Sequence, residues 1–184
     1  MDAVDLDEKG LFNNAMRTWT GRRVDPLTMT YDEVDIRDIA HALARQCRYN
    51  GHTFGHLSVA RHSLWVSDVL IDRYRDDGWI GFAGLLHDAA EAYTGDLIRP
   101  LKNHPRLGAA FAEIEEHVEA AVCERFKLTY PMPPEIHEAD SFVLTHHELA
   151  NERARYTWDS TYQEEEAAFM HQFVALGGGW RIKP

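Results

Sequence analysis

The dipeptide His87-Asp88 stands in an apolar segment, where ionisable side chains are not expected. It follows Gly81-Phe82-Ala83-Gly84-Leu85-Leu86 and precedes Ala89-Ala90. Such groups are rarely buried unless they are paired or bind a metal ion. The dipeptide alone is weak evidence, because chance predicts about one such pair in a chain this rich in histidine and aspartate. Its apolar setting is what indicates a candidate metal site.

Two other segments with helical periodicity also place a polar side chain among apolar ones. His62 shares a face with Val59, Val66 and Val69, and Asp140 shares a face with Ile136, Val143, Leu144 and His147. Taken singly, His62 is more simply a hydrogen-bonded core histidine, and Asp140 a helix-cap partner or half of a buried salt bridge. Together, three helices that direct nitrogen or oxygen ligands inward are a common way to build a metal site in a helix bundle.

His62, His87, Asp88 and Asp140 therefore predict a site with two nitrogen and two oxygen ligands for a divalent cation, with positions left for water. Such an ion can lower the pKa of a bound water to about 7. Glu91 follows Asp88 by three residues, so a continuous helix would place it on the same side, where it could hold or deprotonate that water. The alternatives are a solvated glutamate and a buried polar network without metal.

The elements that must position these residues are helices. Residues 1–30 read as an irregular arm with a candidate hairpin, and residues 177–184 as a C-terminal tail after three glycines. Between them, hydrophobic periodicity and capping signals predict helices at Asp35 to Cys47, Leu57 to Tyr74, Trp79 to Tyr93, Leu107 to Phe126, Pro134 to about Tyr156, and Thr161 to Leu176. Glu115, Glu116 and Glu119 are expected on an acidic outer face. The sequence thus predicts a single all-α domain, 1–184, a bundle of about six helices.

Composition limits the partners. The 184 residues are 45% hydrophobic and 27% charged, as in a globular domain, and the net charge is −11. An acidic surface argues against a nucleic-acid polymer as partner, and a small anionic substrate would need locally gathered cations. The acidic start is unlike a signal peptide, and no apolar run is long enough for a membrane span, so a cytoplasmic protein is expected. Cys47 and Cys123 do not suggest a disulfide scaffold. Cys47 lies beside Arg48, although an ordinary thiol is the simpler interpretation.

These residues resemble the HD-domain phosphohydrolases, whose signature is His…His-Asp…Asp, here His62, His87-Asp88 and Asp140. The strings Arg61-His62-Ser63-Leu64, His87 to Leu97 and Glu138-Ala139-Asp140 look like the bacterial 5′-deoxynucleotidases of this superfamily. The block Asp38 to Leu43, followed by Cys47-Arg48-Tyr49, looks closer to the phage dATP triphosphohydrolases. The resemblance covers roughly Trp19 to His147.

The resemblance implies an HD-domain helical bundle and a role for each matching residue. His62, His87, Asp88 and Asp140 match the ligands of a divalent ion, which could be cobalt, manganese, zinc or magnesium. Glu91 matches the glutamate that activates water, and Asp96 an aspartate that orients the attacking water or the leaving 5′-oxygen. For the substrate, Arg48 and Lys102 match phosphate-binding residues, Tyr49 matches an aromatic near the nucleoside, and a base pocket is expected around Trp19 and Tyr49. His56 departs from the aromatic of the relatives.

The function implied is hydrolysis of deoxynucleotides by hydroxide attack at the α-phosphorus, which releases a deoxynucleoside and triphosphate. The alternatives are a 5′-deoxynucleotidase that releases phosphate from deoxynucleoside monophosphates, and a nucleotide-binding regulator without turnover. The relatives imply a homo-oligomer. The base preference, the native metal and the roles of His52, His56 and His147 are left open by the sequence, although His147 shares the face of Asp140.

Overall fold

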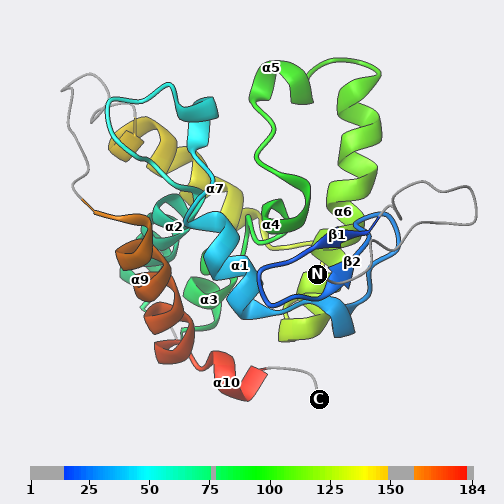
Figure 1. Cartoon of the computed structure of the whole chain (residues 1–184). Coiled ribbons are helices and arrows are strands. Elements are labelled where there is room, and N and C mark those ends of the chain that lie inside the picture. The colour runs from blue at the N-terminus through cyan, green and yellow to red at the C-terminus, as the bar shows by residue number, and fades with distance from the viewer. Residues whose placement is uncertain (1–14, 76–77, 149–159, 182–184) are drawn as a thin grey trace, which may run out of the picture.

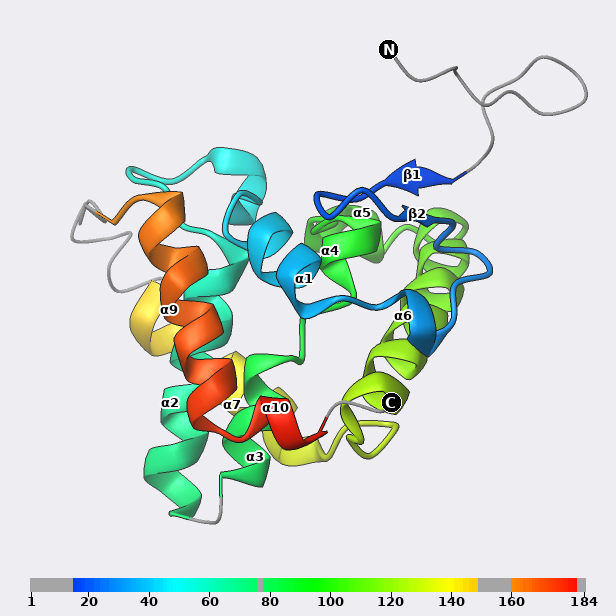
Figure 2. The ribbon, with the colours of Figure 1, turned by 60° about the horizontal axis from the view of Figure 1, so that its bottom comes forward.

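A computed structural model describes residues 15–75, 78–148 and 160–181 of the chain, and these form an α-helical bundle (Figure 1). Helix α2 (Val59–Tyr74) packs against α3 (Trp79–Leu85), α7 (Pro134–Val143) and α9 (Tyr162–Ala175). Helices α1 (Ile36–Leu43) and α4 (Glu91–Thr94) lie between this group and the long α6 (Leu107–Phe126) (Figure 2). The all-α class expected from the sequence is confirmed. The extent of the domain stays a prediction.

The N-terminal arm contains the candidate hairpin. Strands β1 (Met16–Arg17) and β2 (Arg23–Val24) pair in antiparallel fashion, and Gly21 takes a positive φ of 89° in the turn between them. The backbone N–H and the hydroxyl of Thr20 both donate to the buried carboxylate of Asp38 on α1, each at 2.7 Å. These two bonds hold the turn of the hairpin against the bundle. A 3-10 turn, η1 (Tyr31–Glu33), leads from the arm into α1.

The helix starts follow from capping residues. Asp35 accepts from the backbone N–H of Arg37 at the start of α1, and Ser58 accepts from that of Arg61 at the start of α2. The predicted capping box at Thr161 is confirmed and opens α9. Helix α9 ends before Gly177, which has a φ of 84°, as the glycine run predicted.

The expected helix from Trp79 to Tyr93 is wrong in one respect, because it is interrupted. Helix α3 ends at Leu85, residues 86–90 form successive turns, and α4 begins at Glu91. The imidazole Nδ1 of His87 lies 2.8 Å from the carbonyl oxygen of Gly84. In a continuous α-helix this oxygen would accept from the backbone N–H of Asp88. The side chain of His87 thus competes with the helical hydrogen bond and ends the helix.

Four further differences concern short elements. The connecting piece near Pro100 contains α5 (Arg99–Lys102), and the expected C-terminal tail contains α10 (Gly178–Arg181). The helix after Pro134 changes to a π-helical segment, η3 (Leu144–Glu148), and its expected continuation lies outside the described residues. A separate 3-10 turn, η2 (Arg48–Gly51), precedes α2. The bundle therefore has more short helical pieces than the sequence predicted.

Close contact between α2 and α3 depends on glycine. A Cβ atom on Gly84 would lie 2.3 Å from Cδ1 of Leu70, and one on Gly81 would lie 2.5 Å from Cγ1 of Ile71. Without side chains at these positions the two helices can approach closely. This packing fixes the end of α3, and with it His87, against the helix that carries His62.

Candidate active site

His62 lies at the centre of a group of four polar side chains. It is fully buried on α2. Its Nε2 lies 3.1 Å from Oδ1 of Asp140 on α7, 3.2 Å from Nε2 of His87 and 3.5 Å from Oδ2 of Asp88. His87 Nε2 is in turn 3.1 Å from Asp88 Oδ2. The structure therefore brings together the four residues that the sequence singled out, from α2, α7 and the interruption after α3.

The outer nitrogens of both imidazoles have partners that fix where the hydrogens are. A carbonyl oxygen can only accept, so Nδ1 of His87, which contacts Gly84, carries a hydrogen. Nδ1 of His62 lies 2.6 Å from Oε1 of Glu148, a buried carboxylate that also accepts. In the neutral rings both Nε2 atoms then present lone pairs to the cluster. Two such nitrogens and two carboxylates facing one another need a cation between them.

Distances within the cluster suit a metal ion. Ligands bound to a divalent ion at about 2.1 Å are about 3.4 Å apart in a tetrahedron and about 3.0 Å apart as octahedral neighbours. The separations of 3.1, 3.2 and 3.5 Å from His62 Nε2 fall in or near this range. Two imidazole nitrogens with carboxylate oxygens form a donor set that several divalent metals accept. His62, His87 and Asp140, whose ligand atoms all lie within 4.8 Å of one another, thus fit a divalent metal ion, and Asp88 lies beside them.

A proton is the other cation that this cluster stabilises. Burial alone would lower the pKa of His62, but hydrogen bonds to Asp140 and Glu148 raise it to about 9. Burial alone would raise the pKa of Asp140, but the hydrogen bond with His62 holds it below its ordinary value. Both shifts have one physical cause, because the carboxylates and the imidazole stabilise each other's charged forms.

Glu148 is a functional residue that the sequence analysis missed. It is the last residue of η3, is 1% exposed, and accepts from His62, from the Tyr49 hydroxyl at 2.6 Å and from Arg48 Nε. Helical spacing from Asp140 pointed instead to His147, whose side chain lies outside the described part. The wider turn of a π-helix changes the register, and π-helical turns often occur at functional sites.

Arg48 and Tyr49 lie beside the cluster in an unusual turn. Tyr49 has a left-handed backbone, with φ 56° and ψ 31°, which costs about 1–3 kcal/mol for a residue that is not glycine. In this conformation its hydroxyl reaches Glu148, and Nη1 of Arg48 lies 3.7 Å from Oδ2 of Asp88. The turn thus holds a guanidinium near a candidate metal ligand.

The larger of two cavities at the cluster has a volume of about 610 Å³. Three cationic side chains line it, and so do Tyr49 and Asp96, two of the residues expected from the sequence. The cations are Arg48, Arg99 and Lys102. Burial, more than any other influence, raises the pKa of Asp96 above its ordinary value. This volume is within the usual range for a small-molecule site.

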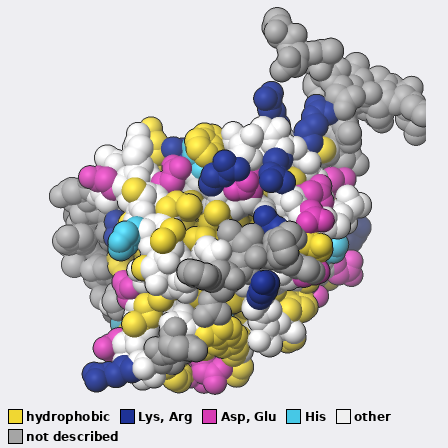
Figure 3. Space-filling view, turned by 90° about the horizontal axis from the view of Figure 1, so that it is seen from below, with side chains coloured by type: hydrophobic (Ala, Val, Ile, Leu, Met, Phe, Trp, Pro, Cys, Tyr) yellow, Lys and Arg dark blue, Asp and Glu magenta, His cyan; other side chains and the backbone are white. Residues whose placement is uncertain are grey.

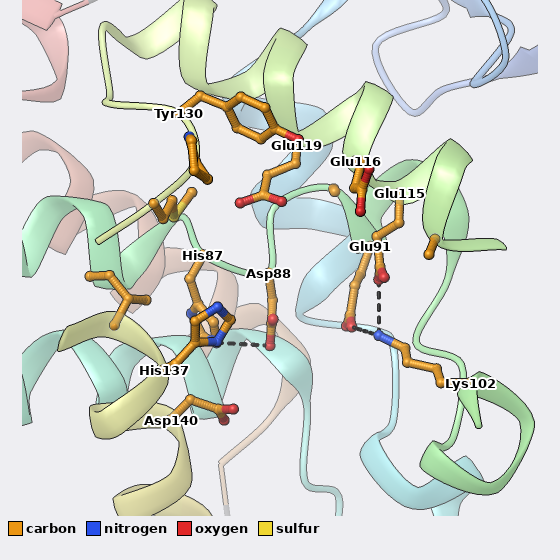
Figure 4. A pocket seen from close by; sticks show the side chains of 15 residues that line it. His87, Asp88, Glu91, Lys102, Glu115, Glu116, Glu119, Tyr130, His137 and Asp140 are labelled. Carbon is orange, nitrogen blue, oxygen red and sulfur yellow. Dashed lines mark hydrogen bonds and ion pairs between the residues drawn. The ribbon is translucent and has the colours of Figure 1, made fainter. Parts of the chain in front are cut away.

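A smaller cavity of about 390 Å³ adjoins the same cluster (Figure 4). Asp88, Glu91, Lys102 and Asp140 line both cavities. Helix α6 adds Glu115, Glu116 and Glu119 to the wall of the smaller one. These three glutamates were expected on an outer face, and that prediction is wrong in part because the helix turns them toward this cavity.

Glu91 is held between charges. Its Oε1 lies 3.5 Å from Lys102 Nζ, which also donates to Oε1 of Glu115 at 2.9 Å. Among the described residues its Oε2 is buried without a hydrogen-bond partner. Burial, then the carboxylates of Asp88 and Asp96, raise the pKa of Glu91. Once ionised, this oxygen can accept a proton from a molecule in the cavities.

Three residues named in the sequence analysis lie apart from both cavities. Trp19 is 59% exposed and stacks on His41, with ring centroids 4.6 Å apart, so the structure does not bring it to the cluster. His56 lines neither cavity and instead contacts Cys47. His52 is exposed in the same loop.

Comparison with known proteins agrees with this geometry. Residues 59–170 match the family described as HD domain. "Uncharacterized protein RCAP_rcc00048" of Rhodobacter capsulatus is 40% identical over 129 residues, which are 67% of this chain and 63% of the relative. "Uncharacterized protein YfdR" of Escherichia coli K12 is 31% identical over 129 residues, which are 70% and 67% of the two chains. The match thus spans slightly less than two thirds of the Rhodobacter relative. The chain belongs to the HD-domain phosphohydrolase superfamily, whose members are generally metal-dependent hydrolases.

Proposed function

We propose that this protein hydrolyses deoxynucleotides at the α-phosphorus, with a divalent metal ion held by His62, His87, Asp88 and Asp140. One observation supports this most directly. A cluster that presents lone pairs and carboxylates, and so needs a cation, opens onto a cavity lined by Arg48, Arg99 and Lys102. The cavity wall also carries four carboxylates, and the whole chain has a net charge of −11, so an anion here would need the three cations and the metal ion together.

The divalent ion would lower the pKa of water and polarise a phosphoryl oxygen. Arg48 would bind phosphate oxygens through the guanidinium N–H groups that are not directed at Glu148. Lys102, which lines the same cavity, would act as a point charge. Glu91 Oε2 would accept the proton of the attacking water, because it is buried and free of a described hydrogen-bond partner.

Asp96 and Tyr49 would act on the nucleoside side of the bond. Burial raises the pKa of Asp96, and its carboxyl would orient the attacking water or the leaving 5′-oxygen. Tyr49 offers an aromatic face beside Arg48, with the guanidinium carbon 5.7 Å from the ring centroid. A role of Trp19 in base binding is also a proposal. Trp19 stacks on His41 and does not line the larger cavity, so it would have to move to contact a base there.

We favour a deoxynucleoside triphosphate as substrate and triphosphate as product. Arg99 on α5 and Asn103 just after it also line the larger cavity. The guanidinium of Arg99 offers further positive charge for the outer phosphates. A 5′-deoxynucleotidase is the alternative, since the bond broken would be the same. The rival from another class, a nucleotide-binding regulator, would bind without turnover.

A screen of all deoxynucleoside mono- and triphosphates with cobalt, manganese, zinc and magnesium separates these functions. Phosphate, pyrophosphate and triphosphate are resolved as products. Triphosphate from a deoxynucleoside triphosphate supports the proposal, phosphate from monophosphates alone supports the nucleotidase, and nucleotide binding without product supports the regulator. Glu91→Gln should reduce product formation by about 10²–10⁴-fold while metal content is unchanged.

Assembly and location are also proposals. Hydrophobic side chains are grouped between charged ones on the face shown in Figure 3, and we propose that the protein forms a homo-oligomer in the cytoplasm and binds small molecules rather than nucleic-acid polymers. Among residues 15–75, 78–148 and 160–181, no helix is both long and apolar enough to cross a membrane. Light scattering at several concentrations tests the oligomer.

A further inference from the structure

A second pair of reactive groups lies outside the candidate active site, in the loop before α2. Cys47 is exposed, and its Sγ lies 3.3 Å from Nδ1 of His56. The other ring nitrogen, Nε2, lies 2.9 Å from the carbonyl oxygen of Ala44. That oxygen can only accept, so Nε2 carries the hydrogen of the neutral ring. Nδ1 is therefore the acceptor, and the thiol of Cys47 is the donor.

The imidazole is also held in position on its far side. Oε2 of the buried Glu165 lies 4.0 Å from His56 Nε2, on the side away from the thiol. The Ala44 carbonyl and this carboxylate thus orient the ring so that Nδ1 faces the thiol. Thiol, imidazole and an orienting acceptor in this order are the arrangement that activates cysteine nucleophiles.

We propose that Cys47 is a modification site, where His56 activates the thiol toward hydroperoxides. The thiol proton moves from Sγ to Nδ1 of His56, and the sulfur attacks one oxygen of the hydroperoxide. The S–O bond forms as the O–O bond breaks, so sulfur is oxidised by two electrons and the peroxide is reduced. The leaving hydroxide takes the proton from His56 as water, and for hydrogen peroxide the products are a Cys47 sulfenic acid and one water molecule.

The second cysteine provides a contrast within the same chain. Cys123 is 1% exposed on α6. Burial, and to a smaller extent Glu119, raise the pKa of its thiol to about 12. This thiol is both inaccessible and protonated at neutral pH, so it should not react. A reagent that modifies Cys47 and leaves Cys123 intact therefore reports exposure as well as local chemistry, and activation by His56 is measured with the His56 variant.

Modification at Cys47 is positioned to affect the larger cavity. Cys47 is the N-cap of η2, whose next two residues, Arg48 and Tyr49, bind Glu148 and line that cavity. An oxygen on Sγ would replace the contact with His56 and shift the start of this turn. Loss of phosphate release after oxidation is the expected consequence. That consequence rests on the proposed function, whereas the reaction of the thiol does not.

The test is trapping of the sulfenic acid on the full, folded chain. The protein is treated with hydrogen peroxide in the presence of dimedone, and the labelled peptides are quantified by mass spectrometry. Cys47 should be labelled and Cys123 should not. His56→Asn should slow labelling by about tenfold, whereas His52→Asn, a change of an exposed histidine in the same loop, should leave the rate unchanged. Equal labelling of both cysteines, or an unchanged rate in His56→Asn, would overturn the proposal.

If His56→Asn does not fold, a measurement on the native sequence tests the proposal instead. The second-order rate of Cys47 with iodoacetamide at pH 7 should exceed that of free glutathione, and a slower rate would contradict activation. If a substrate has been identified, peroxide should lower product formation in the native protein and not in Cys47→Ser. Labelling without loss of product formation would overturn the coupling to the cavity while leaving the modification site in place.

Discussion

Replacement of Glu148 by glutamine tests whether this buried carboxylate fixes the candidate metal site. Glu148 accepts from three donors, on His62, Arg48 and Tyr49. Glutamine has the same shape, but one of its two terminal atoms is an NH₂ group, which cannot accept. With the NH₂ group toward His62, two donors face each other; with it toward Tyr49, the hydroxyl can turn to accept. In both cases the negative charge that supports the His62 imidazole is lost.

Loss of such a carboxylate behind a metal-binding histidine typically weakens metal affinity by about 10–100-fold. At about 1.4 kcal/mol per factor of ten, this is about 1.4–2.8 kcal/mol. The His62 contact is short, at 2.6 Å, and both groups are fully buried, so the effect should lie toward the upper end of that range. Competition with a fluorescent chelator measures the affinity for zinc or cobalt directly.

Tyr49→Phe is the matched control. It removes one donor to Glu148 and keeps the carboxylate, so metal affinity should change by less than about threefold. Circular dichroism checks that Glu148→Gln is folded. Equal metal affinity of native protein and folded Glu148→Gln would refute the reasoning, because the carboxylate would then contribute nothing to the orientation of His62.

Three further predictions concern pH, the hairpin and helix packing. Because the pKa of His62 is about 9 in the metal-free protein, a metal ion must displace a proton below that pH. Metal affinity measured by chelator competition should therefore rise about tenfold per pH unit from about 6.5 and level off above about 9; a flat profile would contradict this. In metal-free protein, protonated His62 contributes fully to the free energy of unfolding below about pH 6.5, and this contribution is lost as the pH rises through about 9. Urea denaturation in the presence of a chelator measures it. Asp38→Ala, which removes both hydrogen bonds from the hairpin turn, should lower the free energy of unfolding by about 2–3 kcal/mol, whereas the exposed Asp32 should tolerate alanine. Gly84→Ala should cost about 1–3 kcal/mol in thermal or urea unfolding through overlap with Leu70, and Gly179→Ala, with open space around it, should be nearly neutral.

The sequence singled out side chains that the structure brings together, because buried ionisable residues stand out against an apolar pattern. His62 is fully buried between Val59 and Val66, as its helical face indicated. The long helix from Leu107 to Phe126 has the bounds predicted, since prolines and a positive-φ residue, Lys127, mark its ends. Patterns of this kind act within one element and can be read locally.

Features that depend on contacts between distant segments were not predictable in this way. Glu148 lies about a hundred residues from Arg48 and Tyr49, and no local pattern links them. The π-helical turn that positions Glu148 breaks the 3.6-residue period on which the choice of His147 rested. The break after Leu85 likewise depends on a side-chain contact, from His87 to Gly84, that competes with the helix. Trp19 was expected near a base, but its ring has a closer partner in His41.

The interruption between α3 and α4 explains how two adjacent residues can serve one ion. On an intact α-helix, neighbouring side chains diverge by about 100°, so His87 and Asp88 would point to different sides. In the turns after Leu85 their terminal atoms come within 3.1 Å of each other. In the proposed site, two of the four donors would therefore depend on the turns at residues 86–90. A bound ion should then slow amide exchange at Ala89 and Glu91, whose N–H groups bond within these turns.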